Sequence, residues 1–515
     1  MSSPEAWLVK VFWFGIISTT YFCCAQRPNI VFIIADDLGW NDVGFHDSEI
    51  ETPNIDALAY DGIILNKYYV SPICSPTRSA IMTGRHPIHT GMQVYVIGGA
   101  TPYGLPLSEI TIAQHLQKLG YRRHLVGKWH LGFFTDAYLP MNRGFESHFG
   151  YYTGHEDYFD HESNDDQMWG LDFHRNGQTL WDVYGNFSTE MYTQEAERII
   201  RSHNQSEPLF LVLAHQAVHA GNQPEPLEVP ESYVERYTNK IKDVKRRMFA
   251  GMVSALDDSV GQVVKVLNET GLMKNTVLVF TTDNGGPTNG YDGNAACNWP
   301  LRGVKNTMWE GGVRGVGLIS SPLLNGQSYV SENFFHVTDW LPTLYHAAGG
   351  DPTTLKNLDG LDLWDMLRKN GEQVRSEVLH NIDPVNKFAS LRVGDYKLVM
   401  GKISVNDNGW YPPPQLSPKK NSDILKRSKV PIVVKCGPKP LNASYNCLPE
   451  VSPCLFHIPM DPCEYENIAD VYPDIVKQML QRLEEYNSTM IPPANKPVDP
   501  NANPALHGGD WKPWM

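Results

Sequence analysis

Three continuous apolar runs stand out in the first 300 residues, and each ends abruptly in polar residues. They are Asn29–Ala35, Pro208–Ala214 and Thr276–Thr282. Runs of this length without polar alternation are typical of parallel strands that helices cover on both faces. A short strand is also predicted over Arg122–Val126, and apolar positions at helical spacing predict a helix over Lys245–Leu267 that ends near Gly271. The pattern therefore predicts an α/β fold with a large, mostly parallel central sheet.

A different pattern begins near Ser376. Phe388–Met400 is typical of antiparallel strands joined by a Gly-Asp turn, and Pro473–Tyr486 is an amphipathic stretch whose proline suits the first position of a helix. We therefore expect two domains. The larger covers residues 26–375, and a smaller α+β domain with an antiparallel sheet covers residues 376–515.

The N-terminus has the pattern of a secretory signal peptide. Lys10 precedes the mostly apolar run Val11–Phe22, and Cys23–Ala25 supplies the small residues of a cleavage site. The competing interpretation is a membrane anchor, but the apolar run is shorter than the roughly 20 residues that span a bilayer. We therefore expect a signal peptide over residues 1–25, no stable membrane anchor, and a lysosomal or extracellular destination. Five possible N-glycosylation sites agree with this route: Asn186, Asn204, Asn268, Asn442 and Asn487.

Charge excludes some classes of function. The 515 residues include 43 Lys+Arg and 57 Asp+Glu, which gives a formal net charge of −14, and 42% of the chain is hydrophobic. That apolar content excludes disorder as the main state, and so acidic a chain is not a general nucleic-acid binder. The proline-rich, basic stretch 411–440 is interpreted as a solvated insertion, with contact to a polyanion as the alternative.

The late cysteines predict disulfides. Four of them crowd into one stretch: Cys436, Cys447, Cys454 and Cys463. In an oxidising compartment they can form two disulfides by any of three connectivities. A zinc cluster is the competing interpretation, but the spacings lack a C-x-x-C pair. Cys297 is then the odd cysteine, and we expect it to be a buried free thiol.

Acidic residues follow two of the apolar runs. Asp36 and Asp37 come directly after the first run, and Asp283 and Asn284 come after the third. Because ligands bind beyond the carboxyl ends of the strands in open α/β sheets, we expect these four side chains to lie close together. An all-oxygen set suits Ca²⁺ or Mg²⁺ better than zinc. The alternative is that each residue caps the helix that follows it.

Further candidate residues suit an anionic substrate. Cys74 lies where a helix can begin, in Cys74-Ser75-Pro76-Thr77-Arg78, so it can be a nucleophile with Arg78 as an oxyanion ligand. A buried structural cysteine is the alternative. Lys128, His130, His219 and Lys305 could grip an anion and protonate a leaving group if they converged with Arg78 beside a cation.

Together these motifs resemble the sulfatase family, in which the cysteine of a Cys-x-Pro-x-Arg segment is oxidised to Cα-formylglycine. The resemblance spans residues 26–515, and within the family the chain is most similar to the arylsulfatase B group. Besides the Asp-Asp pair, the matching segments are Cys74–Arg78, Gly120–Gly132, Thr281–Gly286, Asn298–Gly315 and Trp511–Met515. It implies an alkaline-phosphatase-like sandwich for a catalytic domain over 26–375. One departure is Thr77, where the family usually has serine.

The resemblance also implies a role for each matching residue. Cys74 is the residue that a formylglycine-generating enzyme modifies during secretion, and its hydrated aldehyde attacks sulfur. One Ca²⁺ is held by Asp36, Asp37, residue 74, Asp283 and Asn284. Arg78 holds the hydrate. Lys128 and Lys305 bind sulfate oxygens, His219 protonates the leaving alcohol together with Lys305, and His130 assists expulsion of sulfate.

The implied substrate is the 4-sulfate of N-acetylgalactosamine in dermatan or chondroitin sulfate. The alternative is a small-molecule sulfate, such as a glucosinolate or an aryl sulfate. Three loops are expected to rim the pocket and to decide between them: Gly98–Gly104, Tyr151–Asp160 and Asp292–Asn298. Two other classes stay open, a phosphatase or phosphodiesterase of the same superfamily and a binding glycoprotein in which Cys74 stays unmodified.

Overall fold

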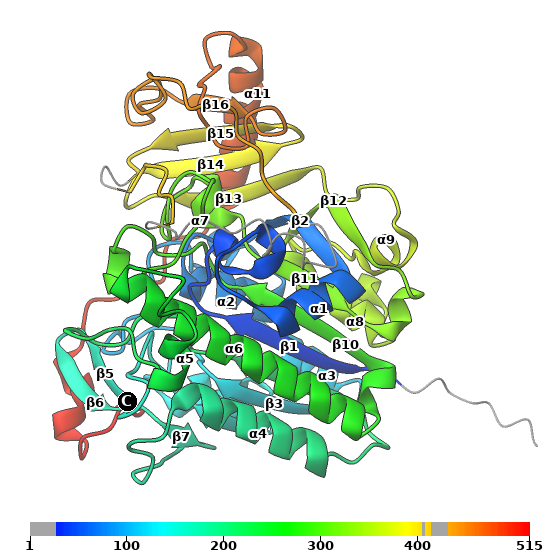
Figure 1. Ribbon diagram of the computed structural model, residues 1–515, viewed down its shortest axis with the longest axis vertical. Coiled ribbons are helices and arrows are strands. Elements are labelled where there is room, and N and C mark those ends of the chain that lie inside the picture. Colours follow the sequence, from blue (N-terminus) through cyan, green and yellow to red (C-terminus); the bar gives the residue numbers. More distant parts are fainter. Residues whose placement is uncertain (1–26, 404–406, 414–430) are drawn as a thin grey trace, which may run out of the picture.

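The largest feature of the computed structural model is a ten-stranded sheet (Figure 1). The structure describes residues 27–403, 407–413 and 431–515, so the predicted signal peptide and the middle of 411–440 lie outside the described residues. The strands of the sheet are β1 (Asn29–Ala35), β2 (Ile63–Tyr69), β3 (Arg122–Gly127), β4 (Ser147–Gly150), β7 (His174–Arg175), β8 (Gln178–Thr179), β9 (Leu209–Ala214), β10 (Thr276–Thr282), β11 (Gly317–Ser320) and β12 (Tyr329–His336). Their order across the sheet is β12-β2-β11-β10-β1-β9-β3-β4-β7-β8.

The middle of the sheet is parallel. Strands β10, β1, β9, β3 and β4 run in one direction, and Ile33 of β1 is paired with Phe280 of β10 and with Leu213 of β9. Strand β11 is antiparallel to both β10 and β2, and β7 and β8 add antiparallel pairs at the other edge. The predicted α/β fold with a mostly parallel sheet is therefore confirmed, and the three apolar runs are neighbouring strands.

Helices cover both faces of the sheet because successive side chains of each strand point to opposite faces. The helices of this body are α1 (Pro53–Asp61), α2 (Cys74–Thr83), α3 (Ile112–Gln117), α4 (Ser188–Ser202), α5 (Glu231–Glu235), α6 (Val244–Glu269), α7 (Glu310–Val313), α8 (Trp340–Ala347) and α9 (Trp364–Lys369). Phe32 of β1 belongs to the core shared with α2, α3, α8 and α9, whereas Ile33 belongs to the core shared with α1, α4 and α6. Helices α4 and α6 lie across the front face in Figure 1.

A second, antiparallel sheet stands at the top of the view in Figure 1. Its order is β13-β14-β15-β16, and the long helix α11 packs against it. The bounds are β13 (Glu377–Asp383), β14 (Phe388–Val393), β15 (Tyr396–Gly401), β16 (Cys454–His457) and α11 (Pro473–Thr489). Of the three possible connectivities, the structure has Cys436–Cys463 and Cys447–Cys454, and Cys297 is buried and free as expected.

A buried ion-pair network joins the second sheet to the main body. Lys397 of β15 lies 3.0 Å from Glu310 of α7 and 2.9 Å from Glu464, and all three side chains are fully buried. Arg392 of β14 donates a hydrogen bond to the hydroxyl of Tyr69 in β2. Because a buried charge without a partner costs several kcal/mol, these contacts couple the packing of the two sheets.

The segment after α11 returns to the main body. The backbone of Ile491 donates to the carbonyl oxygen of Ile88, and Trp511 is buried in the core on the α2 face of the sheet. Trp511 also bonds with Leu171 of the hairpin formed by β5 (Glu162–Asp165) and β6 (Met168–Leu171). The red C-terminal segment therefore lies beside β5 and β6 in Figure 1, away from the second sheet.

Candidate active site

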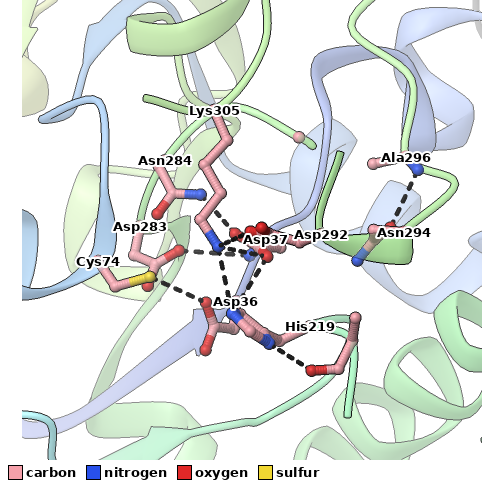
Figure 2. A network of polar contacts seen from close by, with 12 residues as sticks. Asp36, Asp37, Cys74, His219, Asp283, Asn284, Asp292, Asn294, Ala296 and Lys305 are labelled. Carbon is pink, nitrogen blue, oxygen red and sulfur yellow. Dashed lines mark hydrogen bonds and ion pairs between the residues drawn. The ribbon is translucent and has the colours of Figure 1, made fainter. Parts of the chain in front are cut away.

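The polar residues singled out in the sequence converge where the parallel strands end (Figure 2). The carboxyl ends of parallel strands lie along one edge of a sheet, so each loop at that edge can contribute a side chain. The contributions are Asp36 and Asp37 after β1, Lys128 after β3, His219 after β9, and Asp283, Asn284 and Lys305 after β10. Cys74 joins them as the first residue of α2.

Cys74 lies against the acidic residues. Its Sγ is 3.8 Å from Asp36 Oδ1, and the residue is 2% exposed. Burial raises the pKa of the thiol, and the opposing charges of Lys128 and Lys305 do not outweigh burial. The unmodified side chain is therefore a neutral thiol, which is a poor nucleophile.

Arg78 and Lys128 bridge the carboxylates on one side of the site. Arg78 donates to Asp283 Oδ2 from Nε at 3.1 Å and from Nη2 at 2.9 Å, and Nη2 also lies 3.4 Å from Asp36 Oδ2. Lys128 Nζ donates to Asp36 Oδ2 at 2.5 Å. Burial by itself raises the pKa of Asp36, but the charges of Lys128 and Arg78 outweigh burial and hold the pKa below its usual range. Asp36 therefore stays ionised.

Lys305 lies on the other side, between Asp37 and His219. Its Nζ donates to Asp37 Oδ2 at 2.8 Å and to His219 Nε2 at 3.2 Å. His219 Nδ1 is 2.6 Å from the carbonyl oxygen of Ala220, so we place the imidazole proton on Nδ1 and the lone pair on Nε2. Burial, reinforced by the charge of Lys305, lowers the pKa of His219 well below its usual value. The acidic proton of the Lys305–His219 pair therefore lies on the lysine.

His130 is held by a neighbouring loop. Its Nε2 donates to the carbonyl oxygen of Ile97 at 3.0 Å, and its buried Nδ1 has no hydrogen-bond partner among the described residues. Its φ of 55° is uncommon for a residue other than glycine and is typical of functional sites. Burial, together with the charges of Lys128 and Arg78, lowers the pKa of His130. The ring is therefore a neutral base with a free lone pair.

The acidic residues suit a divalent metal ion. Four side chains place ligand atoms within 4.8 Å of one another: Asp36, Asp37, Cys74 and His219. Burial, with repulsion from Asp36, raises the pKa of Asp37 to about 7 and that of Asp283 to about 6, despite the nearby lysines and arginine. The cations of the chain thus compensate these carboxylates incompletely. Asn284 Oδ1 is also buried and without a partner in the described part of the chain, so the oxygen donors fit a hard cation.

Two residues of the site were not singled out in the sequence. Asp292 Oδ2 lies 3.2 Å from Lys305 Nζ, and the ring of His155 stacks on that of His219 with centroids 5.9 Å apart. His219 itself was predicted to act on the proton, yet it also lies within the compact cluster of possible metal ligands. Asp292 and His155 belong to loops expected at the rim, but no motif in either loop distinguishes them from other polar residues.

The comparison with protein families agrees with this geometry. A family model described as Sulfatase matches residues 28–350, which is more than half of the chain. The chain belongs to the sulfatase family. It is therefore an enzyme that hydrolyses sulfate esters, and its alkaline-phosphatase-like fold is the one predicted from the sequence.

Relatives of this sulfatase share most of its length. It is 39% identical to mouse (Mus musculus) Arylsulfatase J over 510 residues, which cover 95% of this chain and 80% of the relative. It is 28% identical to mouse N-acetylgalactosamine-6-sulfatase over 490 residues, which cover 91% of this chain and 87% of that relative. The solved structure of Ps i-CgsB in complex with k-i-k-neocarrahexaose matches with a TM-score of 0.73 and 26% identity, and the match covers 94% of this chain and 98% of that one. The similarity to the arylsulfatase B group in particular stays a prediction.

Proposed function

We propose that this sulfatase uses a Cα-formylglycine made from Cys74 and one Ca²⁺ to hydrolyse the sulfate ester of a sugar. The observation that carries the proposal is the convergence of Cys74 with three carboxylates, Arg78 and two lysines at one edge of the sheet. Asp36, Asp37, Asp283, Asn284 and residue 74 would hold the ion. When present, the hydrated aldehyde supplies an oxygen nucleophile, and the cation supplies a Lewis acid for the sulfate oxygens.

The buried cations of the chain bind and orient the sulfate. Lys128 and Lys305 are almost fully buried, so their ammonium groups interact more strongly with an anion than they would in water. Arg78 presents a guanidinium fixed on Asp283, and it therefore holds its position without reorganisation. These donors stabilise the negative charge that spreads over the sulfate oxygens in the transition state.

Two proton-transfer roles follow from the imidazole tautomers. The leaving alkoxide takes its proton from the Lys305–His219 pair, in which Lys305 holds the acidic proton and its Nζ lies 3.2 Å from His219 Nε2. His130 is neutral and has a free Nδ1, so it can accept a proton when sulfate is expelled.

We propose the 4-sulfate of N-acetylgalactosamine, in dermatan or chondroitin sulfate, as the substrate. Support for a sulfated sugar comes from the similarity to an N-acetylgalactosamine-6-sulfatase and from the structural relative that was solved with a neocarrahexaose. The 4-position rests on the resemblance to the arylsulfatase B group. A small-molecule sulfate is the second candidate. Asp292 favours it, because a carboxylate beside Lys305 repels the uronates of a glycosaminoglycan.

Secretion is part of the proposal. The two disulfides suit an oxidising compartment, and all five predicted glycosylation sites have exposed asparagines. Within the described residues, no helix is both long and apolar enough to cross a membrane. We propose that residues 1–25 direct the chain to a lysosomal or extracellular destination.

A substrate panel tests the proposed function. We expect kcat/KM for N-acetylgalactosamine 4-sulfate to exceed that for the 6-sulfate by about tenfold or more, because an ester on the ring and one on the exocyclic carbon orient the sugar differently when the ester oxygen lies beside Lys305. The panel also includes 4-nitrophenyl sulfate and a glucosinolate, each measured at pH 5 and pH 7. A higher kcat/KM for either small ester supports the second candidate, and hydrolysis of none of the four contradicts the function.

Calcium is expected to stabilise the folded protein. Adding Ca²⁺ to EGTA-treated enzyme at about 100 times its Kd contributes about 2.7 kcal/mol, which corresponds to a rise in Tm of a few degrees for a chain of this size. Differential scanning fluorimetry measures the shift, with Mg²⁺ as the competing cation. Asp37→Asn should lose most of the shift, whereas Asp292→Asn should retain it because Asp292 lies outside the ligand set. An equal shift in wild type and Asp37→Asn contradicts the ligand set.

A further inference from the structure

Asp292 is the outermost charged residue of the sulfate-binding side. Lys305 Nζ lies between two carboxylates, 2.8 Å from Asp37 and 3.2 Å from Asp292 (Figure 2). The Asp37 side chain is fully buried, whereas that of Asp292 is 42% exposed, so Asp292 lies on the solvent side of Lys305. Its φ of 54°, in a turn with Gly290 and Gly293, is part of the bend of the loop. A substrate that reaches Lys305 from solvent therefore passes a negative charge.

The loop before the β5–β6 hairpin adds acidity near His219. His155 stacks on His219, and its Nε2 lies 3.1 Å from Asn222 Oδ1. Asn222 in turn donates to Asp157 from its backbone at 2.6 Å and from Nδ2 at 2.8 Å. Asp157 is thus placed three contacts away from the ring of His219, and it is half-buried.

The β5–β6 hairpin adds two carboxylates near His130. Asp165 Oδ2 accepts from the backbone of Gly99 at 2.8 Å, and Asp166 Oδ2 accepts from that of Ala100 at 3.2 Å. This backbone continues from Ile97, to which His130 is bonded. We call the four residues Asp157, Asp165, Asp166 and Asp292 the acidic rim.

The stretches that carry the rim hold no compensating cation. They contain neither lysine nor arginine in residues 86–117, 144–174, 202–235 and 283–301. The cations at the base of the site, Arg78, Lys128 and Lys305, are already paired with carboxylates. One sulfate can compete for them, but a second anionic group on the substrate meets the rim.

We propose that the acidic rim selects substrates by the charge of their alcohol portion. Esters whose alcohol is neutral or cationic next to the sulfate are hydrolysed in preference to esters that carry a carboxylate there. The inference rests on the proposed function, because it assigns Lys305 to the sulfate. Of the two proposed substrates it favours the second, a sulfate ester of a small neutral alcohol. It disfavours the 4-sulfate of N-acetylgalactosamine where uronates flank that sugar, as in dermatan or chondroitin sulfate. Repulsion between like charges lowers the affinity for substrates that carry a second negative group, and so contributes to specificity.

A matched pair of aryl sulfates tests the charge selectivity without assuming a sugar. The 3- and 4-carbamoylphenyl sulfates are neutral apart from the sulfate, and the corresponding carboxyphenyl sulfates have nearly the same shape with one added charge. At pH 7 and low salt, we expect kcat/KM for the carbamoyl esters to be about tenfold higher than for the carboxy esters. The ratio should shrink in 0.5 M NaCl because salt screens exposed charges.

Variants assign the selectivity to the rim. Asp292→Asn should lower the carbamoyl-to-carboxy ratio about threefold or more, and adding Asp166→Asn should lower it further. The matched control is Asp258→Asn, because Asp258 is 41% exposed and pairs with Arg236 on the surface away from the site. That control should leave the ratio unchanged.

The outcomes separate this inference from the proposed function. Equal kcat/KM for both members of the pair, or a ratio that Asp292→Asn and Asp166→Asn both leave unchanged, contradicts charge selection alone. If neither ester is hydrolysed, the result contradicts both the sulfatase mechanism and the inference. If Asp292→Asn does not fold, the variant at the exposed Asp166, Asp166→Asn, and the salt dependence still test charge selection.

Discussion

Replacing Cys74 by alanine is expected to lower kcat/KM for 4-nitrophenyl sulfate by about 10³-fold or more, because it removes the proposed nucleophile. Cys74→Ser should lose a similar factor: its hydroxyl can attack sulfur but lacks the second oxygen needed to release sulfate by elimination. Steady-state kinetics measures both variants. Mass spectrometry of the tryptic peptide Tyr68–Arg78 from wild-type protein should show loss of the thiol and gain of an aldehyde.

The matched control for this prediction is Cys297→Ala. Both residues are free and 2% exposed, but Cys297 Sγ lies 3.7 Å from Asn41 Oδ1 and outside the site. The control variant should keep its kcat/KM within about threefold. Full activity of Cys74→Ala contradicts the mechanism, and an unmodified thiol in active secreted protein contradicts the formylglycine.

Lys397→Met is expected to lower the free energy of unfolding by about 3–5 kcal/mol, because it removes the ion-pair partner of the buried Glu464 and one of the three cations beside the buried Glu310. Burial already raises the pKa of Glu464 to about 7 against the opposing charge of Lys397, and Glu310 adds repulsion. Without the lysine, at least one carboxylate must take up a proton or the second sheet must separate from α7. Urea unfolding followed by tryptophan fluorescence measures the loss.

Two variants control this prediction. Lys369→Met removes a lysine that lies 2.8 Å from Asp365 but is 66% exposed, and an exposed pair of this kind is worth less than about 1 kcal/mol. Lys397→Met combined with Glu464→Gln should recover part of the loss by removing one buried charge. A Lys397→Met protein as stable as wild type means that the network does not hold the second sheet in place.

The strands that build the site were predictable because burial on both faces leaves a clear sequence pattern. Asn29–Ala35 and Thr276–Thr282 have apolar interiors and are buried at every position, and they form β1 and β10 with the predicted bounds. Because they are parallel neighbours, their trailing Asp37 and Asn284 meet, with Asn284 Nδ2 2.6 Å from Asp37 Oδ1. The same logic placed Lys128 beside Asp36.

Other features depend on contacts that no local pattern encodes. The antiparallel β11 lies between β2 and β10, and its pairing with β2 joins segments more than 200 residues apart. The Cys436–Cys463 pairing was one of several equivalent connectivities. The role of Asp292 could not be predicted from the sequence, because it depends on the distance between Asp292 and Lys305. A carboxylate in a glycine-rich loop is usually solvent-exposed and has no partner.

Because Cys74 is buried in the folded protein, it is accessible to a modifying enzyme only for a limited time during synthesis. In the folded protein Cys74 is 2% exposed. Lys305, which helps to bury it, is synthesised more than 200 residues later. At about 5–20 residues per second, that separation corresponds to roughly 10–50 s of translation. For this interval the Cys74 segment exists without Lys305 or the neighbouring strand β10. Under the proposed conversion of Cys74 to formylglycine, we expect codon usage or chaperones that change this interval to change the fraction of finished molecules that carry the modified residue.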